Sequence, residues 1–489
     1  MKIMLLFCAM ALPLSGCSQA GPPEKPAPSV PTVDPLPGSP AGKAVDVSWR
    51  CTTESAPWKD MGTVALLPGS SKGFAIDASS LGQVVEGFGG AFNEKGWEAL
   101  SLLSPSDRDT VVKDMFDPVE GAKFNICRVP IGASDYAVSR YTLDETKNDY
   151  EMKHFSIERD KQYLLPYIRA AMQYQPGLKV WGSDWTPPPW MKTNGAYDGG
   201  YMKDDPAVYR AYALYLARFV EAYRAEGIDL FAVAVQNEPE IETHYPSCLW
   251  TPAQFKTFVK DYMGPLFAQR NVKADIMFGT IQGRDFSLYP VLLDDPGLKK
   301  YVSIIGFQWD GLASVSMAHI KYPGMRIYQT ETECGNCHWK PGFDPDKPQN
   351  DWAYGVYTWD KIKSFFDGGV SAYMLWNMVL DEEGKSIDAQ LPWPQNAAIV
   401  VNKHTKKVTY TPMFYAFKHF TYYVSPGARY VEMGDREDVV AFSNPDGSLV
   451  IELQNQTDKP RDLSIDVAGG TLSLTLPANS WNTLVVPKD

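Results

Sequence analysis

Two glutamates of this 489-residue chain lie in sequence contexts that suit acid–base chemistry. Glu238 follows Gln236 and Asn237 and precedes Pro239, and Glu331 closes a short apolar run. In a pair of carboxyl groups, one member can protonate a leaving oxygen while the other attacks carbon or activates water. Hydrolysis of a glycosidic bond requires this division of roles, so the pair is the first candidate for a catalytic site.

A third acid complicates the choice of nucleophile. Glu333 stands two residues after Glu331, and if the strand continues that far, both side chains lie on one face. Spacing alone therefore leaves either residue as the nucleophile. A single glutamate at a strand end is more often a solvated surface charge, but two such residues after apolar strands favour a catalytic pair.

Eight short apolar runs predict the strands that position these residues. They span residues 84–88, 124–129, 178–183, 231–236, 275–279, 302–308, 326–330 and 370–376. Helical patterns separate them, for example at residues 206–224, 252–270 and 352–366. This alternation predicts an α/β fold, a (β/α)8 TIM barrel whose active site lies at the carboxyl ends of the strands. Glu238 and Glu331 follow strands four and seven, so they can face each other across the barrel mouth.

The chain changes character after residue 400. Short strands are predicted at residues 428–431, 439–443, 449–454, 461–466 and 471–476, with turn residues between them. Residues 44–83 are also strand-like. We therefore expect a catalytic barrel over residues 84–400 and an antiparallel β-sandwich built from both chain ends, residues 44–83 and 401–489.

The N-terminus has the composition of an export signal. Residues 3–14 form an apolar run that is too short to span a bilayer, and residues 14–17 resemble a bacterial lipobox ending at Cys17. We predict a lipoprotein signal peptide over residues 1–17, lipidation of Cys17 and a Pro-rich tether over residues 18–43. The expected location is the outer membrane of a Gram-negative bacterium; ordinary secretion with cleavage near Ala20 is the alternative.

Composition and residue spacing exclude several function classes. The net charge is -12 with no cluster of Lys or Arg, which argues against binding to nucleic acid. The six histidines lack metal-ligand spacing, so we expect no metal and no cofactor. Residues 334–338 match the haem attachment pattern Cys-x-x-Cys-His once; a loop disulfide or two thiols at Cys334 and Cys337 is the favoured interpretation. We expect a monomer.

The chain resembles glycoside hydrolase family 30, which includes the acid β-glucosidase that cleaves glucosylceramide. Seven motifs in the family's order carry the resemblance, which covers roughly residues 45–489. They are residues 87–92, 127–135, 185–195, 236–239, 330–331, 375–377 and 412–415.

The resemblance implies a retaining β-glycosidase with a covalent glycosyl-enzyme, in which Glu238 is the general acid/base and Glu331 the nucleophile. It implies a carbohydrate substrate, a β-1,6-glucan or a glucosylceramide-like β-glucoside. The implied substrate-binding residues are Arg128, Asp135, Trp185, Asn237, Trp309 and Trp376. Gln308 stands where the glucosylceramide enzyme has histidine, which leaves the aglycone preference open. A β-xylosidase-type member and an inactive, glycan-binding surface lipoprotein are the alternatives.

Overall fold

The computed structural model describes residues 44–71, 73–332, 335–391, 394–434 and 436–488. The predicted signal peptide, the lipidation site at Cys17 and the tether lie outside the described residues. So do Glu333 and Cys334. No helix in the described ranges combines the length and apolarity that crossing a membrane requires.

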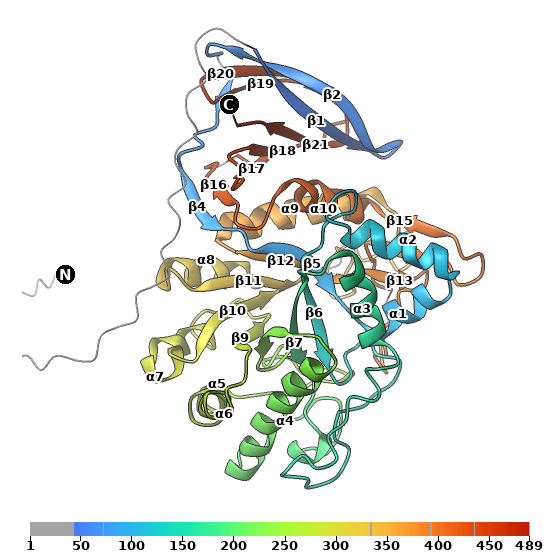
Figure 1. Cartoon of the computed structure of the whole chain (residues 1–489), viewed down its shortest axis with the longest axis vertical. Coiled ribbons are helices and arrows are strands. Elements are labelled where there is room, and N and C mark those ends of the chain that lie inside the picture. The colour runs from blue at the N-terminus through green and yellow to red at the C-terminus, as the bar shows by residue number, and fades with distance from the viewer. Residues whose placement is uncertain (1–43, 72, 333–334, 392–393, 435, 489) are drawn as a thin grey trace, which may run out of the picture. The chain divides into compact units, whose positions relative to one another are not determined.

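Eight parallel strands close into a barrel, in the order β10-β11-β12-β5-β6-β7-β8-β9. Each strand coincides with one predicted run to within a few residues, so the predicted TIM barrel is confirmed (Figure 1). The strands are β5 (Gly87–Ala91), β6 (Ile126–Ile131), β7 (Lys179–Asp184), β8 (Leu230–Ala234), β9 (Asp275–Ile281), β10 (Val302–Gln308), β11 (Arg326–Glu331) and β12 (Ala372–Asn377).

The helices begin where short polar side chains and prolines predict it. Asp205 caps α4 (Pro206–Ala225) by accepting the Ala207 N–H, and proline fills the first helical position. The other barrel helices of eight or more residues are α1 (Glu94–Ser101), α2 (Pro105–Phe116), α3 (Leu164–Tyr174), α8 (Leu312–Lys321) and α9 (Trp352–Gly368).

The predicted helix over residues 252–270 has a π-helical centre. It consists of α5 (Pro252–Thr257), a π-helical segment (Phe258–Met263) and α6 (Gly264–Arg270). Thr251 and Gln254 form a capping box at its start, and Asn271 ends it in the left-handed conformation at φ 54°. The predicted boundaries are therefore correct, although its centre departs from α-helical geometry.

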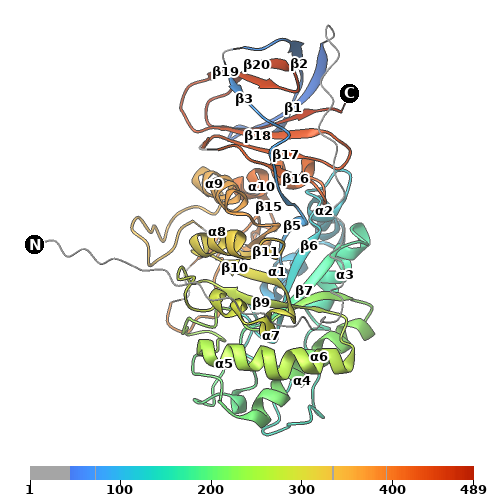
Figure 2. The ribbon, with the colours of Figure 1, turned by 90° about the vertical axis from the view of Figure 1, so that its left-hand side faces the viewer.

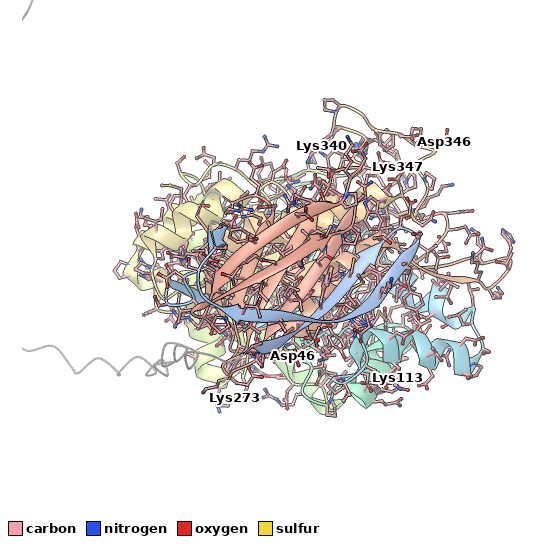
Figure 3. All side chains as sticks on the ribbon, turned by 90° about the horizontal axis from the view of Figure 1, so that it is seen from above. Asp46, Lys113, Lys273, Lys340, Asp346 and Lys347 are labelled. Carbon is pink, nitrogen blue, oxygen red and sulfur yellow. The ribbon has the colours of Figure 1, made fainter. Side chains whose placement is uncertain are left out.

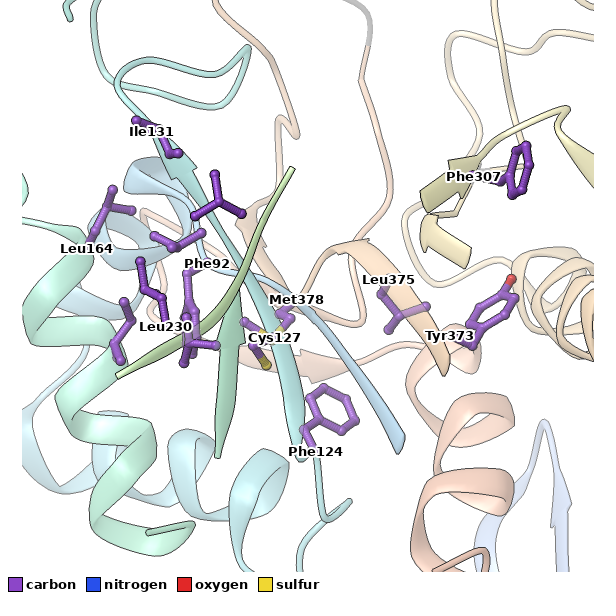
Figure 4. Close-up of a cluster of buried hydrophobic side chains, with 14 of the residues drawn as sticks. Phe92, Phe124, Cys127, Ile131, Leu164, Leu230, Phe307, Tyr373, Leu375 and Met378 are labelled. Carbon is purple, nitrogen blue, oxygen red and sulfur yellow. The ribbon is translucent and has the colours of Figure 1, made fainter. Parts of the chain in front are cut away.

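Two layers of apolar side chains hold the barrel strands in place. Trp181, Met277, Tyr328 and other side chains fill the barrel interior. A larger cluster packs between the strands and the surrounding helices, and Figure 4 shows part of it, including Phe92 and Leu164. Such two-sided burial explains why the strands appear in the sequence as continuous apolar runs.

Both chain ends contribute to a second, ten-stranded sheet, which confirms the predicted sandwich. Its order is β3-β19-β20-β2-β1-β21-β18-β17-β16-β4. Figure 3 views the sheet from above, with the blue N-terminal strands beside the C-terminal ones. The N-terminal strands are β1 (Val45–Thr53), β2 (Ala56–Pro68), β3 (Phe74–Ala75) and β4 (Leu81–Val84). The C-terminal strands are β16 (Arg429–Val431), β17 (Val439–Ser443), β18 (Leu449–Asn455), β19 (Arg461–Val467), β20 (Gly470–Leu476) and β21 (Ser480–Val486).

Strand β21 was not predicted, although it lies between β1 and β18 in the sheet. Its first half carries Asn482 and Thr483, which are buried and polar, so no apolar alternation marks it. The sandwich encloses its own apolar core, and Figure 2 shows β19 and β20 in one layer with β17 and β18 in the other.

The sandwich and the barrel meet through two helices. Trp352, at the start of α9, stacks on Trp481 of β21 with ring centroids 3.9 Å apart. The second helix, α10 (Pro412–Tyr423), carries His419, whose ring is hydrogen-bonded to Thr52 and Thr483 from opposite chain ends. These contacts seat the sandwich on the side of α9 and α10.

Candidate active site

The carboxyl ends of the barrel strands bring the predicted residues into one cavity of about 490 Å3. Six of the eight predicted catalytic and binding residues line it: Asp135, Trp185, Asn237, Glu238, Trp309 and Glu331. The other two, Arg128 and Trp376, do not line the cavity. Both contact Trp185 and are at most 3 % exposed.

Glu331 is the last residue of β11, and both of its oxygens are engaged. Arg128 of β6 forms a buried ion pair with Oε2, and the indole N–H of Trp309 donates to Oε1 at 2.6 Å. Arg128 itself is fully buried and also donates to Asn237 Oδ1 at 2.5 Å and to Ser183 Oγ at 3.1 Å. Fixed donors of this kind favour an ionised carboxylate and hold it in one orientation.

Glu238 occupies a different environment, directly after β8. Its backbone is left-handed, with φ 45°, and its N–H donates to the carbonyl of Thr280 at 2.9 Å. A glutamate rarely adopts this conformation, and non-glycine residues that do so concentrate at functional sites. Trp309 is left-handed as well, with φ 48°. No Lys or Arg among the described residues forms an ion pair with Glu238.

The two carboxyl groups differ in what acts on their pKa. Burial, followed by the negative charges of Glu331 and Glu240, raises the pKa of Glu238 well above its ordinary value. Burial also raises the pKa of Glu331, but the charge of Arg128 and the Trp309 hydrogen bond oppose that rise. The electrostatics therefore favour a proton on Glu238 and a charge on Glu331.

Aromatic rings and one carboxyl group form the buried end of the cavity. Trp185 and Trp376 stack with centroids 5.2 Å apart, and the guanidinium carbon of Arg128 lies 4.2 Å from the Trp185 centroid. Asp135 is 5 % exposed, and its Oδ1 makes no hydrogen bond. An unpaired, buried oxygen that faces a cavity is suited to accept a hydrogen bond from a ligand hydroxyl.

Three contributing residues were missed in the sequence. The predicted fifth strand ended at Gly279, but β9 continues to Ile281 and places Thr280 Oγ1 3.2 Å from Asn237 Oδ1. Ser183 lies inside a predicted strand, and its side chain points to Arg128. Tyr245 lines the cavity from the loop after β8 and packs with Trp185 and Trp376. A longer fifth strand would have indicated Thr280; no sequence signal marked Tyr245.

Residues of the loop after β11 contribute to the wall of the cavity. His338 and Trp339 line it, and buried Cys337 packs against Trp309 and Phe343. Among the described residues, no three His, Cys, Asp or Glu side chains gather as metal ligands. The arrangement offers two carboxyl groups in one cavity, aromatic faces and hydrogen-bonding groups, which together suit a carbohydrate.

Comparison with known families decides the assignment. Residues 85–424 match the glycosyl hydrolase family 30 TIM-barrel domain, and residues 427–484 match the family's β-sandwich domain. The chain belongs to glycoside hydrolase family 30. Members of this family are retaining glycoside hydrolases, so the expectation of a glycoside hydrolase is confirmed, as is the predicted family.

Curated relatives and solved structures agree with the family assignment. The chain is 28 % identical to the lysosomal acid glucosylceramidase of Mus musculus, over 82 % of this chain and 81 % of that protein. It is 25 % identical to the endo-1,6-β-D-glucanase neg1 of Aspergillus fumigatus, over 83 % and 85 %.

Two solved structures share the fold. SrfJ from Salmonella typhimurium aligns with a TM-score of 0.82 at 22 % identity, over 91 % of this chain and all of that one. The endo-β1,6-glucanase BT3312 aligns with a TM-score of 0.78 at 23 % identity and the same coverage.

Proposed function

We propose that this family 30 enzyme hydrolyses β-glucosidic bonds with retention, with Glu331 as nucleophile and Glu238 as general acid/base. The observation that carries the proposal is the asymmetry of the two carboxyl groups. Arg128 and Trp309 donate to Glu331, whereas Glu238 is buried among like charges without an ion-pair partner in the described ranges. Double displacement requires two carboxyl groups of one site to have such different environments.

In the first step, Glu331 Oε attacks the anomeric carbon while the glycosidic C–O bond breaks. The proton of Glu238 moves to the departing oxygen, so the aglycone leaves as a neutral alcohol and Glu238 becomes ionised. Loss of charge at Glu331 is offset by the new negative charge at Glu238. Asn237, held by Arg128, is placed to hydrogen-bond a hydroxyl of the sugar beside Glu331.

In the second step, ionised Glu238 takes a proton from a water molecule, whose oxygen attacks the anomeric carbon. The bond between sugar and Glu331 breaks, Glu331 regains its charge and Glu238 its proton. Two inversions leave the product with the configuration of the substrate. The unpaired Oδ1 of Asp135 accepts from a glycone hydroxyl in both steps, and Trp185, on which Trp376 stacks, contacts the sugar ring.

The names of the relatives support a β-glucoside as the substrate, with β-1,6-glucan and glucosylceramide-like compounds as the candidates. The cavity is lined by Asp135, Glu238, Glu242, Glu331 and Asp388, and no Lys or Arg of the described residues lines it. Like charges repel, so a neutral glycan is favoured over an anionic one.

Trapping the covalent intermediate tests the proposal most directly. A 2-deoxy-2-fluoro-β-glucoside with a good leaving group should inactivate the enzyme and add one glycosyl unit to the peptide that carries Glu331. Fragmentation mass spectrometry distinguishes Glu331 from Glu333 in that peptide. An inverted first product by NMR would exclude double displacement, and hydrolysis of aryl β-xylosides but not β-glucosides would make the chain a xylosidase. A protein that binds glucan without hydrolysing any substrate would support the inactive alternative.

The location of the enzyme rests on the sequence alone. We propose an exported lipoprotein anchored through Cys17, with residues 18–43 as tether. Expression with a radiolabelled fatty acid should label the wild type and not Cys17→Ser, and the variant should leave the membrane fraction. Equal labelling of both proteins would contradict the anchor.

A further inference from the structure

Two large hydrophobic side chains remain exposed at the mouth of the active-site cavity. Trp339 is 49 % exposed and Leu391 is 45 % exposed, and both line the cavity that contains Glu238 and Glu331. Exposing an indole to water is unfavourable, and exposed aromatic residues beside a site commonly mark recognition of a ligand. Neither residue is part of the catalytic arrangement described above.

Trp339 lies beside Trp309 at the exposed rim of the cavity. Its ring centroid lies 5.6 Å from that of Trp309, with the two planes tilted by 47°, and Trp309 donates to Glu331. Asp135 and Trp185 line the same cavity and are at most 5 % exposed. The cavity thus has a buried part, where the glycone fits, and a solvent-exposed aromatic rim, which an aglycone that extends out of the buried part would meet.

We propose that Trp339 is the platform on which the aglycone stacks, and that this aglycone is a neutral sugar ring. The inference rests on the proposed function. The C–H face of a pyranose packs on an indole, and the amides of Gln282 and Gln390, which line the same cavity, suit its hydroxyl groups. An alkyl chain would cover those amides without offering them hydrogen bonds, which is costly.

The test compares three substrates that share a β-glucosyl glycone. As the aglycone, gentiobiose has a second pyranose and octyl β-glucoside has an alkyl chain, whereas the leaving group of β-glucosyl fluoride is a single fluoride ion. Trp339→Ala should lower kcat/KM for gentiobiose about tenfold more than for the fluoride, mostly through a higher KM. The loss for octyl β-glucoside should resemble that for the fluoride, and Trp339→Phe should recover most of the gentiobiose activity.

Tyr201→Ala is the matched control, because Tyr201 is 45 % exposed and does not line the catalytic cavity. The ratio of gentiobiose to fluoride activity should be unchanged in this variant. Thermal unfolding of each variant should match the wild type, since truncation of a half-exposed side chain leaves the core intact.

Several outcomes would overturn the inference. Equal losses of Trp339→Ala on gentiobiose and fluoride would show that Trp339 acts on the glycone or on the fold. A loss confined to octyl β-glucoside would assign the platform to a lipid. A wild type inactive on all three substrates would overturn the proposed function itself, whereas an active wild type with an unchanged Trp339→Ala would overturn only the platform.

Discussion

The barrel mouth and the junction between barrel and sandwich both bury ionisable side chains, but these side chains differ in their state of charge. At the mouth, Arg128 and Glu331 form an ion pair beside an open cavity. At the junction, His419 and Glu452 are both fully buried and lie against Thr483, and neither lines the catalytic cavity.

The junction cluster is neutral near pH 7. Burial lowers the pKa of His419 to about 3 and raises that of Glu452 to about 8. Threonine hydroxyls, at 2.7 Å from the His419 Nδ1 and 2.9 Å from its Nε2, satisfy the ring without a charge. At the mouth, by contrast, a dedicated cation opposes the effect of burial on Glu331.

The comparison shows that a shifted pKa is insufficient to identify an active site. Glu452 and Glu238 are both buried and both have a raised pKa. Glu238, unlike Glu452, lines the catalytic cavity together with a second carboxyl group that can take the complementary role. The following predictions test this distinction, beginning with the largest expected effect.

Replacing Glu331 at the barrel mouth and Glu452 at the junction should give the clearest difference in activity between the two regions. Glu331→Gln should lower kcat on an aryl β-glucoside by a factor on the order of 10⁴, because the amide cannot form the glycosyl ester. Glu452→Gln keeps the buried shape and should leave kcat within about twofold of wild type. Steady-state kinetics on both variants checks this. Comparable activity in Glu331→Gln and wild type would move the nucleophile to another residue, with Glu333→Gln as the next variant.

Replacing Arg128 should remove the positive charge that keeps Glu331 ionised. Arg128→Met leaves a buried carboxylate without its partner, so kcat/KM should fall about 10²-fold and the unfolding free energy by about 3 kcal/mol. Because Arg128 lowers the pKa of Glu331, the acid limb of the kcat/KM profile should move to higher pH. A pH–rate profile of this variant gives the answer. An acid limb that stays in place would mean that the titrating group is not Glu331.

Replacing the acid/base should change the shape of the pH profile. Glu238 must be protonated to act on the leaving group, and its raised pKa sets the basic limb of kcat/KM. Glu238→Ala should lose that limb on a substrate with an activated leaving group, and azide should restore turnover about 10-fold or more by attacking the glycosyl-enzyme. The β-glucosyl azide is the diagnostic product. A basic limb that persists in the variant belongs to another group.

The pH dependence of the unfolding free energy should show the contribution of the junction cluster, His419 and Glu452. Between about pH 3 and 6.5 the unfolded chain binds a proton at His419 that the folded chain lacks, so stability rises with pH. Between about pH 4.5 and 8 the folded chain holds a proton on Glu452 that the unfolded chain loses, so stability falls. The two effects offset each other from pH 4.5 to 6.5.

Above pH 6.5, of the two junction groups only Glu452 still changes the stability. Denaturant unfolding of the wild type should show a declining free energy from pH 6.5 to 8, to which Glu452 contributes together with other buried acids such as Asp184 and Glu240, whose pKa burial raises to about 7. Glu452→Gln should therefore make that decline shallower. Activity at a fixed pH should be unaffected. The same decline in wild type and variant would mean that Glu452 is already ionised at pH 6.5.

The smallest effect should come from one hydroxyl group of the junction. Thr52→Val removes the hydroxyl that lies 2.9 Å from His419 Nε2 and accepts the Trp58 N–H at 3.0 Å, and should cost about 1–2 kcal/mol of unfolding free energy. Thr53→Val, which loses only the bond from the Ala56 N–H at a partly exposed position, serves as the control. No change in either variant would show that water replaces the lost hydroxyl.

The sequence by itself determined the barrel and the catalytic candidates. Eight apolar runs of strand length with helices between them favour one fold, the (β/α)8 barrel. Residues that follow the strands of this barrel meet at its mouth. Glu238 and Glu331 were therefore identified from position, and the family motifs distinguished their roles. Strand β21 was not predicted, because Asn482 and Thr483 are polar and interrupt the apolar pattern. They are nevertheless buried, since hydrogen bonds satisfy their side chains.

Only the tertiary structure decided how the site works. Arg128, Asn237, Trp309 and Glu331 come from four separate strands or strand ends, and no spacing predicts that their side chains meet within hydrogen-bonding distance. The unpaired Oδ1 of Asp135 and the exposure of Trp339 likewise follow from how the loops pack. Apolar patterning is a local property that the chain carries along its length, whereas the pairing of buried charges depends on which distant residues the fold brings together.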